Sequence, residues 1–371
     1  MKILSITNCP LDESLGSGKT VIRWSEGLRK LGHEVDVLEP KDYQIFPQQR
    51  RALKFRSALG AWQFIKKNVS LEQYDLMECY GDEFWLLLRQ LSQQKKRPFL
   101  VAHTNGLELL HRDRERIYHP PKTLKERAYS LFAEQTHARF SRIAFERVDA
   151  FVSICELDRA YVLDRGLYPP NRTAVIEPGL DPEFLDIPFN PQRQHRVAYL
   201  GSWTERKDLD TLCLVARNLL IRYPDLKFDL FGTNIAPEFV YSAFPETLHP
   251  RLVVRPRLET AEMAKGLAQA KVFFLPSQYE GFGMATAEAM ACGCAAVTTP
   301  TGFGGDLKSG EDAIICNFSD AVAMESAIAQ LLENEAFRLK IARAGYERAQ
   351  KLRWDSAVSQ LESVYQNWVR Q

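Results

Sequence analysis

One segment of the chain, residues 272–299, has a residue pattern suited to binding a phosphorylated ligand. A polar loop with Glu280 and Gly283 lies between an apolar strand pattern and a run of good helix formers at 284–292. Free N–H groups and the positive dipole end at the start of such a helix bind phosphate. Glu280 precedes the helix, and Glu288 in its second turn can accept hydrogen bonds from a hydroxyl pair, as in a ribose or a sugar ring. The alternative is a surface helix with a solvated Glu288.

A second candidate is the stretch GSGKT at 16–20, which follows the apolar run MKILSI and precedes an amphipathic run. It is similar to the end of an ATP-binding phosphate loop. That loop needs a glycine five residues before Gly18, where this chain has Glu13. A charged residue in place of the turn glycine hinders wrapping around a triphosphate. We expect a strand, a loop and a helix here, and a P-loop ATPase stays an alternative.

The elements that position these residues follow from the alternation of short apolar runs with amphipathic stretches. This alternation is typical of parallel sheets with crossover helices. In such sheets, ligands bind at the carboxyl ends of the strands. The expected strands are 2–7, 34–39, 74–79, 98–103, 149–154 and 173–177, followed by 196–201, 226–231, 251–255, 271–275, 295–298 and 313–316.

The alternation breaks once, at LDIPFNPQRQHR (185–196), which is rich in Pro, Asn and Gln and has no periodicity. This composition is typical of a linker between domains. We therefore expect an N-terminal domain at 1–188 and a C-terminal domain at 195–350. The stretch 351–371 has the amphipathic pattern of a helix.

The bulk composition is that of an ordinary globular protein. The chain has 371 residues, is 45% hydrophobic and 26% charged, and carries a formal net charge of +1, which gives no overall attraction to nucleic acid. Its seven cysteines form no CxxC pair, as expected for buried thiols in a reducing compartment. No run approaches the roughly 18–20 apolar residues of a membrane span. We expect a cytoplasmic protein that could rest peripherally on the inner face of a membrane.

The pattern at 272–299 resembles the E-x7-E signature of retaining glycosyltransferases with the GT-B fold, PS-x-x-E-G-F-G-x-x-x-x-E-A-M-A-x-G. It is most similar to the family 4 group, which uses nucleotide-sugars. Further landmarks occur in the same order: GHEV at 32–35, HTNGLE at 103–108, PGLD, and RKDLDTL at 206–212. The resemblance implies an α/β fold with two doubly wound, Rossmann-like parallel-sheet domains facing a central cleft. It makes 1–188 the acceptor-side domain and 195–350 the nucleotide-sugar-binding domain, with 351–371 forming a helix that crosses back to the first domain.

The resemblance assigns roles to the glutamates and to the turn between them. Glu280 matches the first glutamate, which contacts the donor sugar and stabilises charge at the reacting carbon. Glu288 matches the second, which binds the ribose. The backbone of the turn would hold the sugar and the distal phosphate through residues Gly281, Phe282, Gly283, Met284 and Ala285.

The cationic part of the donor site falls on the segment after the strand at 196–201. Lys207 matches the lysine that pairs with the diphosphate. Ser202 stands where the family has an arginine, so Arg206 is the expected substitute. Arg255 and Leu258 lie where the family contacts the base.

In the first half, Gly16 matches the second glycine of the family's first loop, which approaches the donor phosphates. Its partner position holds Leu15, so Gly18 is expected to share the task, with Lys19 as an extra cation. His103 is similar to the histidine that meets the donor sugar, and a hydrogen-bonded core histidine is its alternative.

No permanently bound cofactor or metal is expected. The acidic DLD at 208–210 imitates a metal-binding D-x-D motif. It stands at a predicted helix start, where acidic residues complement the dipole, and GT-B enzymes do not require such a metal. We therefore interpret it as a helix cap.

These expectations together predict transfer of a hexose from a UDP- or GDP-hexose to a hydroxyl group of a glycan, lipid or small molecule. The resemblance implies retention of configuration, with the departing phosphate accepting the acceptor's proton. The alternatives are a P-loop-like ATPase, a nucleotide-sugar 2-epimerase and a non-catalytic nucleotide-sugar sensor.

The acceptor must be recognised by the first domain, where motifs are weak. Residues 50–68 and 121–147 are basic and aromatic, and between Lys41 and Arg147 the chain has 20 Lys and Arg against 12 Asp and Glu. Such segments could meet an anionic membrane surface and a lipid-linked acceptor, or hold an anionic glycan. Ordinary solvated helices are the alternative, and no nucleic-acid partner is expected.

Overall fold

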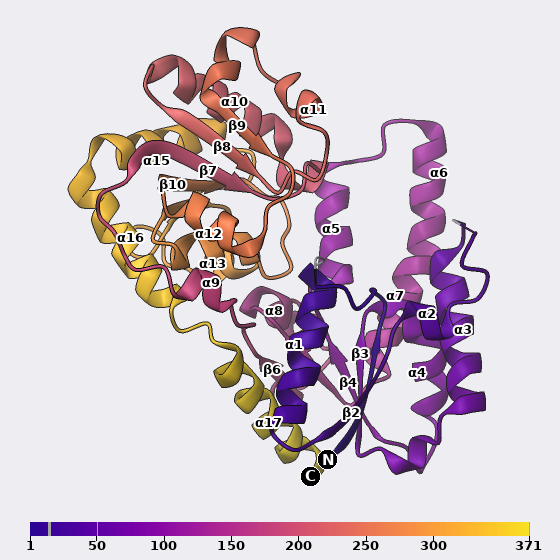
Figure 1. Ribbon diagram of the computed structural model, residues 1–371. Helices are drawn as coiled ribbons and strands as arrows, with labels where there is room; N and C mark the ends of the chain where they lie inside the picture. Colours follow the sequence, from indigo (N-terminus) through magenta and orange to yellow (C-terminus); the bar gives the residue numbers. More distant parts are fainter. Residues whose placement is uncertain (14–15, 50, 371) are drawn as a thin grey trace. The chain divides into compact units, whose positions relative to one another are not determined.

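The chain forms two compact units, each built on a parallel sheet with flanking helices (Figure 1). The computed structural model describes residues 1–13, 16–49 and 51–370. The first unit comprises Met1–Pro178 with the C-terminal helix, and the second comprises Gly179–Arg353. The predicted pair of doubly wound parallel sheets is therefore confirmed.

The first sheet has the strand order β2-β1-β3-β4-β5-β6, and all neighbouring strands are parallel. Its strands are β1 (Lys2–Thr7), β2 (Glu34–Leu38), β3 (Leu76–Tyr80), β4 (Phe99–His103), β5 (Ala150–Ser153) and β6 (Thr173–Val175). The α-helices of the unit are α1 (Gly16–Lys30), α2 (Pro40–Tyr43), α3 (Leu53–Asn68), α4 (Trp85–Leu91), α5 (Glu108–Tyr118), α6 (Leu124–Ala133), α7 (Arg139–Glu146), α8 (Glu156–Asp164) and α17 (Trp354–Arg370).

Side chains that alternate along the strands bury two separate apolar layers, one on each face of the first sheet. Ile3 and Leu76 belong to the layer under α1 and α17, whereas Leu4 and Met77 belong to the layer under α3 and α4. A strand buried on both faces must be apolar at nearly every position, which explains the continuous apolar runs in the sequence.

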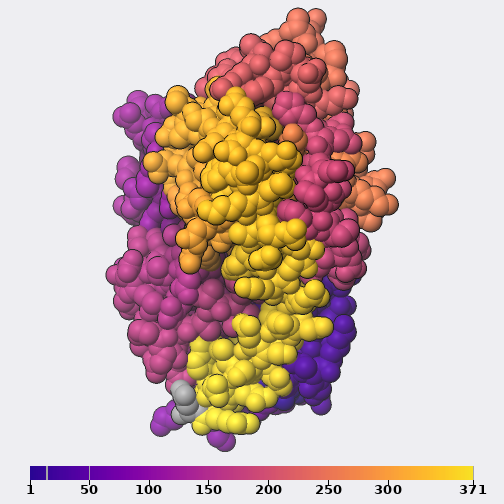
Figure 2. Space-filling view, turned by 90° about the vertical axis from the view of Figure 1, so that its left-hand side faces the viewer, coloured from indigo at the N-terminus to yellow at the C-terminus, as the bar shows by residue number. Residues whose placement is uncertain are grey.

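The C-terminal helix α17 completes the first of these layers. Trp354 packs edge-on against Trp24 of α1 with ring centroids 5.1 Å apart, and His33 Nε2 lies 2.9 Å from Glu362 Oε1. In the space-filling view, the yellow C-terminal residues lie beside the indigo N-terminal residues of this unit (Figure 2). Residues 351–371 were expected to return to the first domain, and the structure groups the chain from Trp354 onward with that unit.

The second sheet has the order β12-β11-β10-β7-β8-β9, again with parallel neighbours. Its strands are β7 (Gln194–Leu200), β8 (Lys227–Phe231), β9 (Leu252–Arg255), β10 (Ala270–Leu275), β11 (Ala295–Thr298) and β12 (Ile314–Ile315). The α-helices of this unit are α9 (Pro182–Leu185), α10 (Leu209–Arg222), α11 (Pro237–Tyr241), α12 (Thr260–Leu267), α13 (Met284–Ala291), α14 (Phe303–Asp306), α15 (Ala321–Glu333) and α16 (Glu335–Ala349).

The boundary between the units lies before the linker expected at 185–196. The chain divides after Pro178, and Leu180 N already donates a hydrogen bond to Leu352 O at 3.0 Å within the second unit. Helix α9 packs against α12 and α13 and buries Phe184. Residues 179–188, which were expected in the first domain, therefore belong to the second unit, where a short helix with buried apolar residues packs.

Candidate active site

The loop after β10 carries the predicted signature and leads directly into α13. Gly283 is the N-cap of this helix, and the N–H of Thr286 donates to Gly283 O at 3.0 Å. The first turn of α13 thus begins at the carboxyl edge of the second sheet, as predicted. Its N–H groups lie next to the loop that holds Glu280, which is the arrangement expected for an anion site.

Glu280 is the central acid of this loop, and its side chain is held by two donors. Its Oε1 accepts hydrogen bonds from Lys207 Nζ at 2.5 Å and from Ser277 Oγ at 2.6 Å. Its backbone N–H donates to Thr301 Oγ1 at 3.0 Å. Glu280 is only 8% exposed, so its carboxylate is fixed in a mostly dry environment.

Lys207 reaches Glu280 from the short 3₁₀ helix Glu205–Lys207, which follows β7. Lys207 is 5% exposed. A backbone hydrogen bond of 2.9 Å from Gln278 N to Arg206 O ties this helix to the loop of Glu280. The two predicted catalytic residues of the second unit, which lie 73 positions apart in sequence, are therefore brought together as a buried ion pair.

The electrostatics of the pair keep the carboxylate charged. Burial alone would raise the pKa of Glu280, but the charges of Lys207 and Arg206 and the hydrogen bonds from Lys207 and Ser277 outweigh it. The pKa of Glu280 therefore lies below its ordinary value. The site offers a fixed negative charge with a buried cation beside it, and the exposed Arg206 adds a second positive charge.

The loop after β11 packs against the loop that holds Glu280. Phe282 and Phe303 are both buried, with ring centroids 5.1 Å apart, and Phe303 N donates to Phe282 O. Gly302 has a φ of +53°, and a Cβ built on it would lie 2.3 Å from Phe282 O. Only glycine fits at this close backbone approach, so Gly302 is a structural requirement of the loop.

The remaining predicted residues of the turn lie around the start of α13. Gly281, Met284 and Ala285 are partly exposed, and Glu288 is partly exposed one turn further into the helix. The carbonyl oxygen of Ser202 accepts a hydrogen bond from Tyr199 Oη at 3.1 Å.

Arg255 and Leu258 line a separate cavity of about 350 Å³ in the second unit. It also contains the ion pair of Arg196 Nη1 with Asp229 Oδ1, 2.6 Å apart. Burial raises the pKa of Asp229 although Arg196 opposes the shift. Arg255 ends β9 at the same sheet edge, but neither Lys207 nor Glu280 lines this cavity.

The structure differs from the expectation for GSGKT. Gly16 to Thr20 form the first turns of α1 instead of a loop. Gly18 is buried, and a Cβ built on it would lie 2.3 Å from Pro10 O, so this glycine serves backbone packing. A Cβ on Gly16 would meet nothing within 4 Å. The neighbouring position Leu15 lies outside the described residues.

His103 is a core residue. A core position was the alternative for this histidine, whereas the prediction was a contact with the donor sugar. It is 0% exposed and stacks on Tyr80 with ring centroids 4.6 Å apart. Its Nδ1 lies 3.4 Å from Tyr365 Oη of α17 and 3.6 Å from Glu78 Oε2. In this structure the ring therefore has no surface to offer a ligand.

A carboxylate cluster in the first unit was not singled out by the sequence. Lys54 Nζ lies 2.6 Å from both carboxylate oxygens of Asp82, and Asn8 Nδ2 donates to Glu83 Oε2 at 2.8 Å. Burial, together with the charges of Asp82 and Glu83, raises the pKa of Glu108 well above its usual range. Glu108 lies 25 positions after Glu83 and shares no motif spacing with Asp82 and Glu83, so no local signal could identify the cluster. Ser277 falls on the serine of the PS-x-x-E signature but was given no role, and Thr301, 21 positions after Glu280, was missed because no spacing rule joins the two.

The DLD stretch acts at a helix start. Asp208 is the N-cap of α10, and its carboxylate accepts a hydrogen bond from Thr211 N at 3.3 Å. Among the residues that the structure describes, no group of three His, Cys, Asp or Glu side chains is placed to hold a metal ion. None of the helices in the described ranges has the length and apolar character to cross a membrane.

Two family models match consecutive parts of the chain. The model described as Glycosyltransferase Family 4 matches residues 15–184, and the model described as Glycosyl transferases group 1 matches residues 182–348.

Named relatives agree with these models. A phosphatidyl-myo-inositol mannosyltransferase of Mycolicibacterium smegmatis is 23% identical over 382 residues, covering 96% of this chain and 92% of that protein. A D-inositol 3-phosphate glycosyltransferase of Corynebacterium aurimucosum is 25% identical, and the alignment covers 53% of this chain and 51% of that protein.

Solved structures share the fold. Sucrose-phosphate synthase of Thermosynechococcus elongatus superposes with a TM-score of 0.77 at 19% identity, covering 99% of this chain and 98% of the other. Anabaena HepE in complex with UDP gives a TM-score of 0.70 at 15% identity, covering 99% and 100%. The chain therefore belongs to the group 1, family 4 glycosyltransferases, retaining enzymes with the GT-B fold that transfer a sugar from a nucleotide-sugar donor.

Proposed function

We propose that the second unit binds a nucleotide-diphosphate hexose around the Lys207–Glu280 pair. The hexose lies against Glu280, and the diphosphate lies against Lys207, Arg206 and the first turn of α13. The observation that carries the proposal is the buried pair of Lys207 and Glu280 beside the start of that helix. A buried cation beside the loop that leads into the start of a helix is suited to a diphosphate leaving group.

The chemistry follows from the charges at the site. The ammonium of Lys207 has three donors, so it can bind a phosphate oxygen while keeping its hydrogen bond to Glu280. As the glycosidic bond breaks, negative charge grows on the diphosphate, and Lys207 and Arg206 neutralise it. The ionised Glu280 stabilises the positive charge that develops at the anomeric carbon.

The nucleoside part of the donor is assigned to Glu288, Arg255 and Leu258. Glu288 would accept hydrogen bonds from the ribose hydroxyls, and Arg255 and Leu258 would contact the base from their cavity. The bound UDP in Anabaena HepE supports a uridine donor, so UDP-hexose is tested first and GDP-hexose second. Gly16 stays a proposed donor contact of the first unit, since a side chain there would meet only open space. Gly18 and His103 are left out because both are buried.

The test is a calorimetric titration with UDP- and GDP-hexoses, followed by turnover measurements. Lys207→Met should weaken donor binding about tenfold to a hundredfold, because a hydrogen bond to a charged group contributes about 1.5–3 kcal/mol. Glu280→Gln should lower turnover far more than affinity. Lys340→Met, which removes an exposed lysine of α16, is the charge-matched control. The donor assignment fails if Lys207→Met binds the donor as tightly as the control does.

For the acceptor, we favour a lipid-linked molecule presented at an anionic membrane surface. Large apolar side chains on α3 and α6 are exposed, among them Leu53 (51%), Leu124 (84%) and Phe132 (53%). Phe55 of α3 and Phe132 of α6 both lie near the ring of His137, with centroids 6.1 and 6.3 Å away, so the two helices share one surface. The same helices carry exposed lysines and arginines. Exposed apolar groups among basic residues favour docking on anionic lipid.

Vesicle flotation tests this docking. The enzyme should float with phosphatidylcholine vesicles that contain phosphatidylglycerol and not with phosphatidylcholine alone. The double variant Leu124→Ser/Phe132→Ser should lose flotation, whereas Ile221→Ser, at a 65% exposed position of the second unit, should keep it. Equal flotation of both variants would exclude this surface and favour a soluble glycan acceptor.

A further inference from the structure

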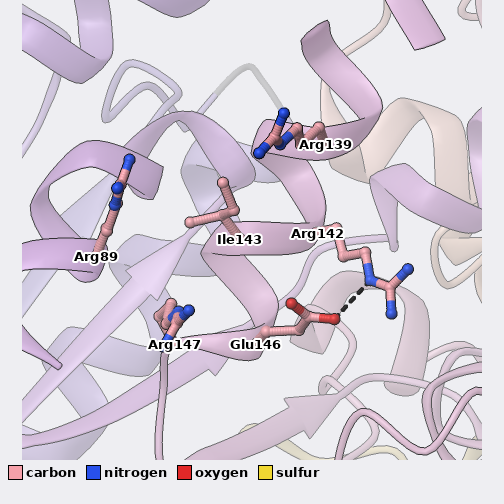
Figure 3. A pocket seen from close by; sticks show the side chains of 6 residues that line it. All are labelled: Arg89, Arg139, Arg142, Ile143, Glu146 and Arg147. Carbon is pink, nitrogen blue, oxygen red and sulfur yellow. Dashed lines mark hydrogen bonds and ion pairs between the residues drawn. The ribbon is translucent and has the colours of Figure 1, made fainter. Parts of the chain in front are cut away.

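Four arginines surround one pocket of the first unit, and none of them belongs to the proposed donor site. The pocket has a volume of about 390 Å³ and lies between α4 and α7 (Figure 3). Arg89 comes from the last turn of α4, and Ile143 is its only apolar lining residue. The rest of the lining belongs to one stretch of α7 and its C-cap: Arg139, Arg142, Glu146 and Arg147.

The arrangement on α7 is a single helical stripe. Positions 139, 142, 143, 146 and 147 follow the spacing i, i+3, i+4, i+7 and i+8, so their side chains share one face. Like charges on one helical face destabilise an isolated helix. Helix dipoles favour cations near the carboxyl ends of helices, which suits Arg89 and Arg147, but they give no reason for Arg139 in the first turn of α7. The stripe therefore collects positive charge at a cost to local stability.

The negative charge in the pocket does not balance the positive charge. Glu146 pairs with Arg142, with Oε1 and Nε 2.5 Å apart. Among the residues that the structure describes, the guanidinium groups of Arg89, Arg139 and Arg147 have no hydrogen-bond or ion-pair partner, and Figure 3 shows this for the residues drawn. Four guanidinium groups against one carboxylate leave a net charge of +3 in the pocket.

We infer that this pocket is a binding site for a phosphate-bearing ligand. A guanidinium presents a planar set of donors that matches phosphate oxygens in pairs, and three such groups here are unoccupied. The scarcity of apolar lining excludes a ligand held mainly by its hydrocarbon part. Clustered phosphates, as in a pyrophosphate or in a phosphorylated lipid headgroup, fit the charge and the volume. The site shares no residue with the proposed donor site, so it does not depend on that assignment.

The experiment titrates the protein with inorganic pyrophosphate in the presence of excess UDP, so that the donor site is occupied. Pyrophosphate should bind the wild type, and Arg139→Ala/Arg147→Ala should weaken binding at least tenfold. Lys95→Ala/Lys96→Ala removes the same charge from an exposed loop of the same unit and should bind like the wild type. Arg139→Lys/Arg147→Lys keeps the charge and should be intermediate, because lysine lacks the planar pair of donors.

A second arm separates the two sources of phosphate. If the ligand is a lipid headgroup, pyrophosphate binding is weak, and flotation with phosphatidylglycerol vesicles falls in the double arginine variant and not in the lysine control. Binding of pyrophosphate with no effect of the variant on flotation identifies a soluble ligand. If the arginine and lysine variants behave alike in both arms, general surface charge explains the result and the inference is overturned. UDP affinity, measured alongside, reports separately on the donor site.

Discussion

The buried pair of Lys207 and Glu280 allows one experiment to separate stability from function. The perturbation is a double-mutant cycle of Lys207→Met, Glu280→Gln and the combined variant. The side chains of the two residues are 6% and 10% exposed, so water and salt screen their interaction little. Each single variant leaves one charged group buried without its countercharge, whereas the double variant leaves none.

The magnitudes follow from this asymmetry. Breaking a buried ion pair by removing one partner costs about 3–5 kcal/mol, but replacing both partners by neutral groups is often close to neutral. Each single variant should therefore lose about 3 kcal/mol or more of unfolding free energy, and the double variant should lose much less than the sum. The coupling energy should be about 3 kcal/mol in favour of the pair. In Glu280→Gln, Ser277 can still donate to the amide oxygen, which isolates the effect of charge.

The assay is urea unfolding of the four proteins at neutral pH, read by tryptophan fluorescence and by circular dichroism to detect separate unfolding of the two units. Donor titrations on the same samples complete the cycle. The donor affinity should fall in every variant that lacks Lys207, whatever its stability. Additive losses of stability, or a stable Lys207→Met variant, would refute the description of the pair as buried and strongly coupled.

Three further predictions follow from the structure. Glu108→Gln should gain stability relative to the wild type as pH rises above about 4.5. The pKa of Glu108 is raised, so the native wild type holds an extra proton, and losing it costs up to about 1.4 kcal/mol of unfolding free energy per pH unit. Urea midpoints of both proteins from about pH 4 to pH 8 check this, and a constant difference between them contradicts it. Gly302→Ala should reduce both stability and donor binding, because its Cβ would clash with backbone at 2.3 Å, whereas Gly305→Ala, with its nearest contact at 3.7 Å, should be tolerated; thermal melts compare them. Leu361→Ala, at a fully buried position of α17, should destabilise the first unit by about 2–5 kcal/mol without changing UDP affinity, and an exposed Ser356→Ala change is its control.

The sheets were predictable because their central strands, such as β1, β3, β4 and β10, are buried on both faces. In a chain of this length, a continuous apolar run of five or six residues bounded by polar turns is typical of a buried strand. The start of α13 at Met284 was predictable for a local reason, since glycines precede a run of strong helix formers. The pairing of Glu280 with Lys207 required the family resemblance, because 73 residues separate them and no spacing rule joins them.

What the sequence could not predict depended on distant packing. His103 ends its strand at the expected edge, but Trp24 of α1 and Tyr365 of α17 cover it, and the latter lies 262 positions away. GSGKT has the composition of a loop, yet Gly18 packs against the backbone of residues 10–12 and α1 already begins at Gly16. The domain boundary differs from the expected one because α9, a four-residue helix with two buried apolar residues, is too short to give a periodic signal in the sequence.

The environment of Glu280 also distinguishes between two ways of retaining configuration. A carboxylate nucleophile needs a free oxygen aimed at the anomeric carbon and a partner acid about 5 Å away. Here Oε1 is occupied by Lys207 and Ser277, and the cause that raises the pKa of Glu280 is burial and not the charge of a second acid, while Lys207, Arg206 and Ser277 lower it. Such a carboxylate is ionised and weakly nucleophilic, which suits electrostatic stabilisation of a positively charged transition state. In the proposed donor site, the departing diphosphate then accepts the proton of the acceptor hydroxyl, and Lys207 neutralises the negative charge that grows on this leaving group.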